Sequence, residues 1–594
     1  MNAERIKYDM DIFDALGLIG GLCLFLFGMN IMGQALERRA GSRLSYLLEK
    51  MTSNKLAGFL TGLAVTAIIQ SSSATTVMVV GFVNSGIMTL RQAINVIMGA
   101  NVGTTVTAWI LSLGGIDSSN VFVKLLKPTS FTPILALIGI ILFMFCKSNK
   151  KKDTGTILLG FATLMFGMDA MSTSVSGLSD VPAFREMFVA FENPLLGVLV
   201  GALLTAVIQS SSASVGILQA LSSTGQVSYG AAIPIIMGQN IGTCITAIIA
   251  SFGANKNAKR AAVVHLSFNV IGSIVWLTVF VIVKSLFTPL ILEQAASEFG
   301  IAICHSLFNI LCTALLLPLT GLLEKLANQI VRDAKAPETI TLLDDRLLTT
   351  PPVALERSSV LTVTMGQTAI NGLKKSLSAL SGYTPELAKE IREAEDETDR
   401  YEDILGTYLV KLSSYQMSDK DSADASKLLR VIGDFERIAD HSVNIVESAE
   451  EMRDKGINLS EHARAEISVL SSAVSEILDL SYKSFRDGDM EAAAKVEPLE
   501  EVIDGLKETL RSRHITRLQQ GECTIAAGFV LSDLLTNLER VADHCSNIAG
   551  CVIDTAKNNM NLHESLRAVR TEDEDFRKLA RMYSEKYSIN GVKV

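Results

Sequence analysis

Long apolar runs separated by short polar stretches fill the first 325 residues of the chain. A helix that crosses a membrane needs about 20 mostly apolar residues. Seven runs have a suitable length, near 15–35, 92–113, 131–147, 154–175, 230–252, 263–286 and 299–323. This pattern predicts a polytopic helical membrane protein embedded in a lipid bilayer.

Two further apolar segments, near 55–88 and 194–227, are interrupted at their centres by polar residues. Each has about 34 residues, too many for one crossing and too few for two full crossings. We therefore expect two re-entrant hairpins, each made of two half-depth helices joined at the polar residues. The interruptions, called the serine runs below, are Gln70-Ser71-Ser72-Ser73, followed by Thr75, and Gln209-Ser210-Ser211-Ser212, followed by Ser214.

The serine runs belong to a duplicated unit. Phe27-Gly28-Met29, Asn54, the first serine run and Asn101-Val102-Gly103-Thr104 each have a counterpart 139 residues later. Three predicted crossings separate the starts of the two copies, and an odd number inverts the second copy. Loop 36–55 is basic and its counterpart 175–194 is not, which places the first on the cytoplasmic side. This topology predicts an external N-terminus and a cytoplasmic C-terminal part.

Polar groups at membrane depth survive only around a cavity or inside protein. Inverted repeats with interrupted helices are typical of secondary transporters, whose site lies between the repeats. Half-helix N-termini favour an oxyanion, whereas hydroxyl, amide and carbonyl oxygens suit Na⁺. We expect both serine runs, Thr75, Ser214, Asn101 and Asn240 to form such a site. The alternative for these residues is close packing between helices.

The duplicated Gln-Ser-Ser-Ser runs resemble the type II sodium–phosphate cotransporter family over about residues 12–325. The resemblance implies alternating-access transport of inorganic phosphate with Na⁺ as the coupling ion. A membrane-bound phosphate sensor is the rival function, and a third is the same scaffold carrying or exporting another oxyanion. The substrate and sodium site that the resemblance implies consists of Gln70, Ser71, Ser72, Ser73, Gln209, Ser210, Ser211 and Ser212.

After residue 326 the chain changes character. Residues 326–356 contain three prolines and predict a linker, and amphipathic helices follow from about residue 357. The segment 434–441 returns as 537–544, which predicts two three-helix units. The expected fold class is therefore all-α. Its domains are a membrane transport domain at 12–325 (repeats near 15–153 and 154–325), the linker, and a helical domain at 357–585.

Each copy of this second repeat places a Glu and an Asp four residues apart on one helix face. Such carboxylates can bind a metal from a helical bundle. The alternative is a bundle seam in which Arg437 and Arg540 pair with the acids. The motif is similar to that of PhoU domains, phosphate-signalling proteins that bind metal. This resemblance implies a divalent or iron-type metal at Glu436, Asp440, Glu539 and Asp543, with Asp399 and Asp504 as further ligands.

Composition narrows the functions further. The 594-residue chain has a formal net charge of −9 and no long basic run, which argues against nucleic acid as a partner. Its eight cysteines lack regular spacing and indicate reduced thiols in a cytoplasmic C-terminal part. The absence of nucleotide-binding and hydrolase motifs argues against an enzyme. We expect an inner-membrane protein, with a phosphate-signalling protein or a second copy of the chain as further candidate partners.

Overall fold

The computed structural model describes residues 12–40, 54–115, 127–176, 191–287, 289–332, 343–415, 417–557 and 574–589. These ranges are almost entirely helical, and they contain no β-strand beyond an isolated bridge between Ser228 and Ala295. The predicted all-α fold class is confirmed. The chain divides into two compact units, Met1–Val353 and Ala354–Val594. Much of loops 36–55 and 175–194, whose charges set the predicted orientation, lies outside the described residues.

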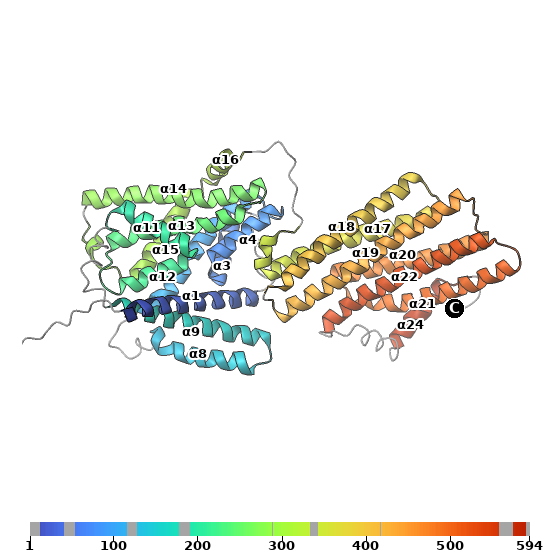
Figure 1. Cartoon of the computed structure of the whole chain (residues 1–594), viewed down its shortest axis with the longest axis horizontal. Helices are drawn as coiled ribbons and strands as arrows, with labels where there is room; N and C mark the ends of the chain where they lie inside the picture. Colours follow the sequence, from blue (N-terminus) through green and yellow to red (C-terminus); the bar gives the residue numbers. More distant parts are fainter. Residues whose placement is uncertain are drawn as a thin grey trace, which may run out of the picture. The chain divides into compact units, whose positions relative to one another are not determined.

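The first unit is a helical assembly in which α1, α9 and α8 pack in sequence against one another (Figure 1). Its α-helices are α1 (Ile12–Ala40), α3 (Lys55–Ile69), α4 (Ser72–Asn84), α5 (Leu90–Gly103), α6 (Thr105–Ser112), α8 (Pro128–Phe145), α9 (Asn149–Ser176), α11 (Pro194–Ile208), α12 (Ser211–Ser222), α13 (Tyr229–Ser251), α14 (Lys256–Phe287), α15 (Glu298–Leu316) and α16 (Thr320–Ile330). The short 3-10 helices are η1 (Leu113–Gly115), η3 (Leu290–Glu293) and η4 (Asp345–Thr349).

Six of the described helices are long and apolar enough to cross a membrane, when α5, α6 and η1 are taken as one. They match six of the seven predicted runs. The seventh, near 131–147, forms α8, a shorter apolar helix that contains Pro133. Large apolar side chains such as Phe13 on α1, Ile134 on α8 and Leu286 on α14 are 59–72% exposed. Exposed apolar surface of this kind is typical of contact with lipid, and the first unit is a multi-pass membrane domain.

Each serine run separates two short helices, as the sequence predicts. Gln70, between α3 and α4, has a φ of 61°, and Gln209, between α11 and α12, has a φ of 59°. In the described chain these two glutamines are the non-glycine residues with positive φ. The free-energy cost of this conformation is roughly 1–2 kcal/mol for an L-residue. The next residues, Ser71 and Ser210, cap α4 and α12 by accepting a backbone N–H three residues later.

Glycines on α1 and α9 show how the two copies are related. A Cβ atom on Gly28 would lie 2.7 Å from the Gly160 carbonyl oxygen. A Cβ atom on Gly21 would lie 2.9 Å from the Gly167 carbonyl oxygen. The later glycine of each helix therefore meets the earlier glycine of the other, so α1 and α9 run antiparallel. Since α1 and α9 are equivalent in the duplication, the repeats are inverted.

A second set of glycines holds the short helices before the serine runs against the long helices that follow. A Cβ atom on Gly103 of α5 would lie 2.8 Å from the Thr66 Cβ on α3. The equivalent Gly242 of α13 stands in the same relation to Thr205 on α11, again at 2.8 Å. A side chain larger than glycine would clash at these positions, so both glycines allow close approach of the helices.

The second unit is a bundle of two three-helix repeats (Figure 1). His441 Nδ1 of the first repeat lies 2.8 Å from Asn537 Oδ1 of the second. The equivalent His544 Nδ1 lies 2.9 Å from Asp434 Oδ1, so each repeat's histidine bonds the other repeat. The helices are α17 (Pro351–Ala379), α18 (Pro385–Ser413), α19 (Asp419–Asp454), α20 (Glu461–Asp487), α21 (Met490–Gln519), α22 (Ile525–Lys557) and α24 (Glu574–Lys586).

Candidate functional site

The two serine runs meet in the folded chain. Ser73 Oγ donates a hydrogen bond to the Gln209 carbonyl oxygen at 3.4 Å. Thr107 on α6 connects the runs a second time. Its hydroxyl donates to Gln70 Oε1 at 2.9 Å and receives a hydrogen bond from Ser212 Oγ at 3.3 Å. Because Gln70 and Ser212 belong to different copies, this network crosses the interface between the repeats.

Gln70, Ser72 and Thr75 of the first serine run are buried, and hydrogen bonds join the run to the end of α3. Gln70 is 8% exposed, and its Nε2 donates to the Ala67 carbonyl oxygen at 2.5 Å. The Thr66 hydroxyl donates to Thr75 Oγ1 at 3.0 Å, and Thr75 in turn donates to the Ser71 carbonyl oxygen at 3.0 Å. These bonds join the end of α3 to the start of α4 and fix the left-handed turn between them.

The second serine run has the same backbone but different side-chain surroundings. Gln209 is exposed. Thr205 and Ser214, the equivalents of Thr66 and Thr75, are both 0% exposed, yet neither hydroxyl has a hydrogen-bond partner among the described residues. Gln239 on α13 is also fully buried. Its Nε2 donates to the Ser214 carbonyl oxygen at 3.0 Å, whereas its Oε1 lacks a partner in the described chain.

The other predicted site residues are buried in the same helices. Ser72 and Ser211, the first residues of α4 and α12, are each 5% exposed. Asn101 Oδ1 lies 3.3 Å from His265 Nε2, and Asn101 Nδ2 has no partner among the described residues. Asn240 Nδ2 donates at 2.9 Å to a carbonyl one turn earlier in its own helix. Asn101 therefore keeps a donor available, and Asn240 uses one of its donors within its helix.

The electrostatics of this region come from the backbone. Neither serine run contains a charged side chain. Both α4 and α12 begin at the runs, so the unpaired N–H groups and positive dipole ends of two helices lie there. Such ends favour an oxyanion, and the hydroxyl and amide oxygens nearby suit a hard cation. The arrangement can hold an anion and a cation together without a fixed charge.

Sequence reasoning missed four residues beside the serine runs, which are Thr66, its equivalent Thr205, Thr107 and Gln239. Thr107 keeps the 139-residue offset, since its equivalent is Thr246. A search for hydroxyl residues that keep this offset outside the serine runs finds the threonines. The position equivalent to Gln239 is an alanine, so no repeat signal marks that residue.

The segment before the second unit is anchored to both repeats. Asp344 is 2% exposed and accepts a hydrogen bond from Asn84 Nδ2, at the end of α4, at 2.6 Å. Arg346 Nη1 lies 2.9 Å from Asp344 Oδ2. The Arg346 guanidinium also donates to the Phe252 carbonyl oxygen at 2.9 Å and to the Ala250 carbonyl oxygen, at the C-terminal end of α13. We call residues 343–350 the joining segment.

Apolar contacts strengthen this attachment. Leu347 of the joining segment is fully buried, and a Cβ atom on Gly81 of α4 would lie 2.7 Å from Leu347 Cδ2. Asn255, before α14, adds two bonds to Asn84, from its backbone N–H at 2.7 Å and from Nδ2 at 2.8 Å. A segment expected within the linker 326–356 thus packs tightly on the ends of α4 and α13.

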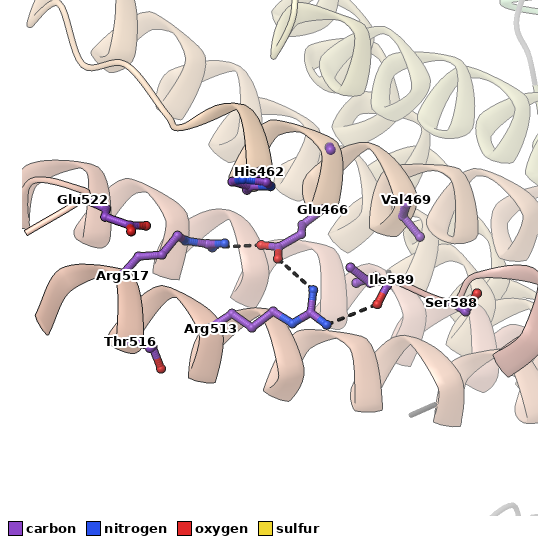
Figure 2. A pocket seen from close by; sticks show the side chains of 10 residues that line it. His462, Glu466, Val469, Arg513, Thr516, Arg517, Glu522, Ser588 and Ile589 are labelled. Atoms are coloured by element: carbon purple, nitrogen blue, oxygen red, sulfur yellow. Dashed lines mark hydrogen bonds and ion pairs between the residues drawn. The ribbon is translucent and has the colours of Figure 1, made fainter. Parts of the chain in front are cut away.

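A cavity of about 380 Å³ lies in the second unit, between α20 and α21 (Figure 2). Figure 2 shows the guanidinium groups of Arg513 and Arg517 converging on the Glu466 carboxylate. Arg513 Nη1 lies 3.1 Å from Glu466 Oε1, and Arg517 Nη2 lies 2.8 Å from Glu466 Oε2. This charged group lies outside the duplicated acidic motif.

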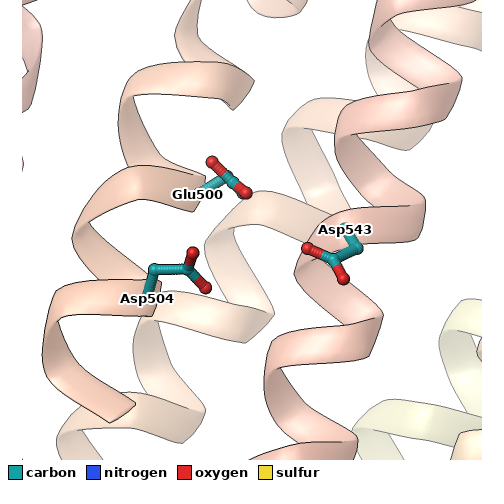
Figure 3. Close-up of side chains that lie close together, drawn as sticks. All are labelled: Glu500, Asp504 and Asp543. Atoms are coloured by element: carbon teal, nitrogen blue, oxygen red, sulfur yellow. The ribbon is translucent and has the colours of Figure 1, made fainter. Parts of the chain in front are cut away.

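Three carboxylates approach one another in the second repeat of this unit (Figure 3). Ligand oxygens of Glu500 and Asp504 on α21 and of Asp543 on α22 all lie within 4.8 Å of one another. Burial, and then the neighbouring Glu539, raise the pKa of Asp543. Glu539 itself lies 2.8 Å from Lys507 Nζ. The structure thus brings Asp504 and Asp543 together and adds Glu500, which shares the four-residue spacing but lies outside the motif.

The acids of the first repeat pair with arginine, as the alternative interpretation predicts. Arg437 lies 3.5 Å from Glu436 and 3.3 Å from Asp440. Arg540 pairs with Asp543 in the same way, at 3.4 Å. Burial, and then the charge on Asp440, raise the pKa of Glu436, and Asp399 on α18 adds to the effect. Metal binding and a salt-bridged seam are therefore both compatible with these positions.

Comparison with known proteins identifies both units. The sequence profile of the Na+/Pi-cotransporter family matches residues 24–173 and 179–303, and that of the PhoU domain matches residues 362–449 and 467–552. The "Uncharacterized protein YqeW" of Bacillus subtilis (strain 168) is 31% identical over 313 residues, which cover 52% of this chain and 96% of that protein.

Two more relatives carry functional names. The protein of Escherichia coli (strain K12) named "Putative inorganic phosphate export protein YjbB" is 25% identical over 551 residues, 91% of this chain and 97% of that protein. The human "Sodium-dependent phosphate transport protein 2B" is 38% identical over 98 residues, 16% of this chain and 14% of that protein. The chain belongs to the Na+/Pi-cotransporter family, whose members are transporters and not enzymes, and it carries a C-terminal PhoU domain.

Proposed function

We propose that this protein moves inorganic phosphate across the inner membrane by alternating access, coupled to Na⁺, and that its PhoU domain regulates transport from the cytoplasm. The observation that carries the proposal is the hydrogen-bonded network between the two serine runs. Two inverted breaks that share one network provide a single site between two repeats, which is what alternating access requires.

The phosphate is bound by the helix N-termini of α4 and α12 and by the hydroxyls of the serine runs. Ser72 and Ser211 begin these helices and are buried. The Gln70 side chain accepts a hydrogen bond from Thr107, and Thr107 accepts one from Ser212. Gln70 is thereby linked to the other repeat. Asn101 Nδ2 is a further buried donor for an anion.

The residues present also fit Na⁺. Thr205 Oγ1, Ser214 Oγ and Gln239 Oε1 are buried oxygens without a partner in the described chain. A buried oxygen without a partner is unfavourable, and a hard cation that accepts oxygen ligands relieves that cost. We assign Na⁺ to these three residues of the second repeat, and its charge compensates that of the phosphate.

Flux of radiolabelled phosphate in proteoliposomes tests the proposal. We expect phosphate flux that rises with an imposed Na⁺ gradient and that is measurable in both gradient directions. Phosphate flux that does not change with the Na⁺ gradient contradicts the coupling. The absence of any phosphate flux supports the rival sensor function. The relative named for phosphate export makes outward flux the direction to measure first.

The joining segment supports the regulatory part of the proposal. It bonds the end of α4 from the first repeat and the end of α13 from the second, and it continues directly into α17 of the PhoU domain. Rocking of one repeat against the other changes these contacts, so a PhoU domain that favours one arrangement shifts the transport equilibrium. Coupling of this kind is worth about 1–3 kcal/mol, or roughly 5- to 150-fold in an equilibrium.

Two truncations test this mechanism. A protein that ends after residue 350 keeps the joining segment and loses the PhoU domain, whereas one that ends after residue 330 loses both. We expect the longer form to insert and carry phosphate without its response to phosphate supply. The shorter form uncovers the α4 surface that Leu347 buries, and its rate changes further. If the longer form is folded but inactive, the PhoU domain belongs to the transport machinery.

The PhoU domain contains a cluster of carboxylates whose oxygens fit a metal ion. Glu500, Asp504 and Asp543 supply carboxylate oxygens, which hard and borderline divalent cations prefer. We propose that a divalent or iron-type metal binds there and makes the domain responsive to metal supply or to a phosphate-signalling partner. Glu436, Asp440 and Glu539 remain candidate ligands, although each of these acids pairs with a basic side chain, Arg437 or Lys507.

A further inference from the structure

The cavity between α20 and α21 has the size and the walls of a small-molecule site. A volume of about 380 Å³ lies in the range that organic ligands fill, and it exceeds what a bare inorganic ion needs. Its walls combine apolar and polar groups. Ala465, Val469 and Ile589 supply apolar surface, and charged residues line the rest of the cavity.

Two arginines supply an anion-binding wall. Arg517 is 8% exposed, and its Nε has no hydrogen-bond partner among the described residues. Arg513 and Arg517 share the single carboxylate of Glu466, which is 5% exposed. Two guanidinium groups paired with one carboxylate leave a net positive charge. The Arg517 Nε–H adds a donor without an acceptor in the described chain. Guanidinium groups bind phosphate oxygens with charge-assisted hydrogen bonds.

The rim limits the charge and size of the ligand. Glu522 stands at the edge of the cavity (Figure 2). Thr516 on α21 is exposed, and its hydroxyl donates to the Ser512 carbonyl oxygen at 3.2 Å. A carboxylate at the edge repels highly charged anions, so one phosphate group is favoured over a chain of phosphates. Arg513 Nη2 donates to the Ile589 carbonyl oxygen at 3.2 Å, so the C-terminal stretch closes one side.

We propose that this cavity binds a small phosphate monoester. Its phosphate lies on Arg513 and Arg517, and its organic body lies against Val469 and Ile589. The site differs from the transport site and from the acidic cluster of Figure 3. Only the effect of the ligand on transport rests on the proposed regulatory function, because binding itself is independent of transport.

Isothermal titration of the purified full-length protein in detergent tests the proposal. The probes are glucose 6-phosphate and adenosine 5′-monophosphate, with glucose and adenosine as controls that lack the phosphate. We expect at least one ester to bind and neither parent compound to do so. R513Q and R517Q should each weaken ester binding by about tenfold or more, since each removes a charged donor. E466Q should strengthen it severalfold, because the competing carboxylate is gone.

Matched variants distinguish the loss of this binding site from general effects of a substitution on the protein. R486Q removes an arginine on α20 that pairs with Asp487 at 2.7 Å on the surface, and it should leave ester binding unchanged. S211A lies in the transport site and should also leave it unchanged, whereas inorganic phosphate binding to that site should fall. Each variant's thermal unfolding midpoint shows whether it is folded.

Three results overturn the proposal. They are no binding of either ester at millimolar concentration, ester affinity in a folded R517Q protein equal to that of the wild type, and equal affinity for inorganic phosphate and the esters in S211A. The last result reduces the cavity to an inorganic phosphate site. Loss of transport in proteoliposomes with retained ester binding contradicts the proposed function and leaves this inference intact.

Discussion

The two serine runs share one sequence motif and one backbone conformation, but their side chains have different surroundings. Gln70 and Gln209 adopt almost the same φ, 61° and 59°, but Gln70 is buried and bonded to Thr107 whereas Gln209 is exposed. The threonine pair beside the first run is hydrogen-bonded, and the equivalent hydroxyls of the second run have no partner in the described chain. Equivalent sequence therefore does not give equivalent environments.

This difference is compatible with the proposed alternating access, in which inverted repeats adopt two states. Two copies with equal sequence motifs can exchange their conformations, so that the other glutamine becomes the buried one. Under that proposal, a structure with Gln70 buried and Gln209 exposed represents one end of the exchange. Each side chain then has two environments during a transport cycle, and a substitution can affect stability in one state and transport in both.

Replacement of the two glutamines should have the largest effect. Q70A and Q209A should both lower phosphate flux by about tenfold to 100-fold, because Gln70 bonds the Thr107 hydroxyl that links the repeats and Gln209 occupies the equivalent position of the second serine run. Only Q70A should lower the thermal stability of this state by several degrees, since it also leaves the Thr107 hydroxyl without its acceptor. Flux assays and thermal unfolding measure the two effects.

Glycine variants control for the backbone. Q70G and Q209G keep the left-handed conformation without a Cβ atom, whereas alanine retains the strain that glutamine already has there. Each glycine variant should therefore be at least as stable as the alanine variant at the same position. If Q70A and Q209A lower stability equally, the comparison of side-chain surroundings fails.

Serine variants should have a smaller and more symmetric effect. Ser72 and Ser211 begin α4 and α12 and are each 5% exposed. S72A and S211A each remove a donor and an acceptor at a cost of about 1–3 kcal/mol, which predicts about a tenfold loss of phosphate affinity. Membrane insertion should be normal. Wild-type transport kinetics in both variants would mean that the serine runs serve only for packing.

The unpaired hydroxyls of the second repeat allow a test of the sodium assignment. T205V should weaken Na⁺ binding severalfold and leave thermal stability without Na⁺ unchanged or slightly higher, because it removes a buried oxygen that has no partner in the described chain. The matched variant T66V should lower stability, because it breaks the bond to Thr75. Stabilisation of the protein by added Na⁺ provides a readout that is independent of flux. Equal Na⁺ dependence in the two variants contradicts the assignment.

Sequence reasoning succeeded where the signal was local or repeated. Hydropathy gave the spans, and the constant offset of 139 residues gave the inverted repeats. It also located both helix breaks, since a run of polar residues is unfavourable in the middle of a continuous helix that faces lipid. The unequal surroundings of Gln70 and Gln209 could not be predicted, because burial depends on neighbours outside the motif, such as Thr107 beside Gln70.

The joining segment shows a second limit. Its proline-bearing sequence predicts a linker, yet Leu347 is fully buried and Asp344 is 2% exposed. A single short 3-10 turn is too brief to show a hydrophobic period, so no pattern marked these residues as part of the core. The proposed metal site shows the same limit, since the motif predicts Glu539 as a ligand, whereas the structure pairs that residue with Lys507.

The duplicated acids of the PhoU domain extend the comparison to the second unit, with the smallest expected effect. Mn²⁺ at about ten times its dissociation constant stabilises a binding domain by about 1.4 kcal/mol, which raises the unfolding midpoint by a few degrees. D504N should abolish this shift, because Asp504 shares the acidic cluster with Glu500 and Asp543. E539Q should keep most of it, since Glu539 pairs with Lys507 at 2.8 Å. If E539Q abolishes the shift and D504N does not, the metal follows the sequence motif rather than the cluster in the structure.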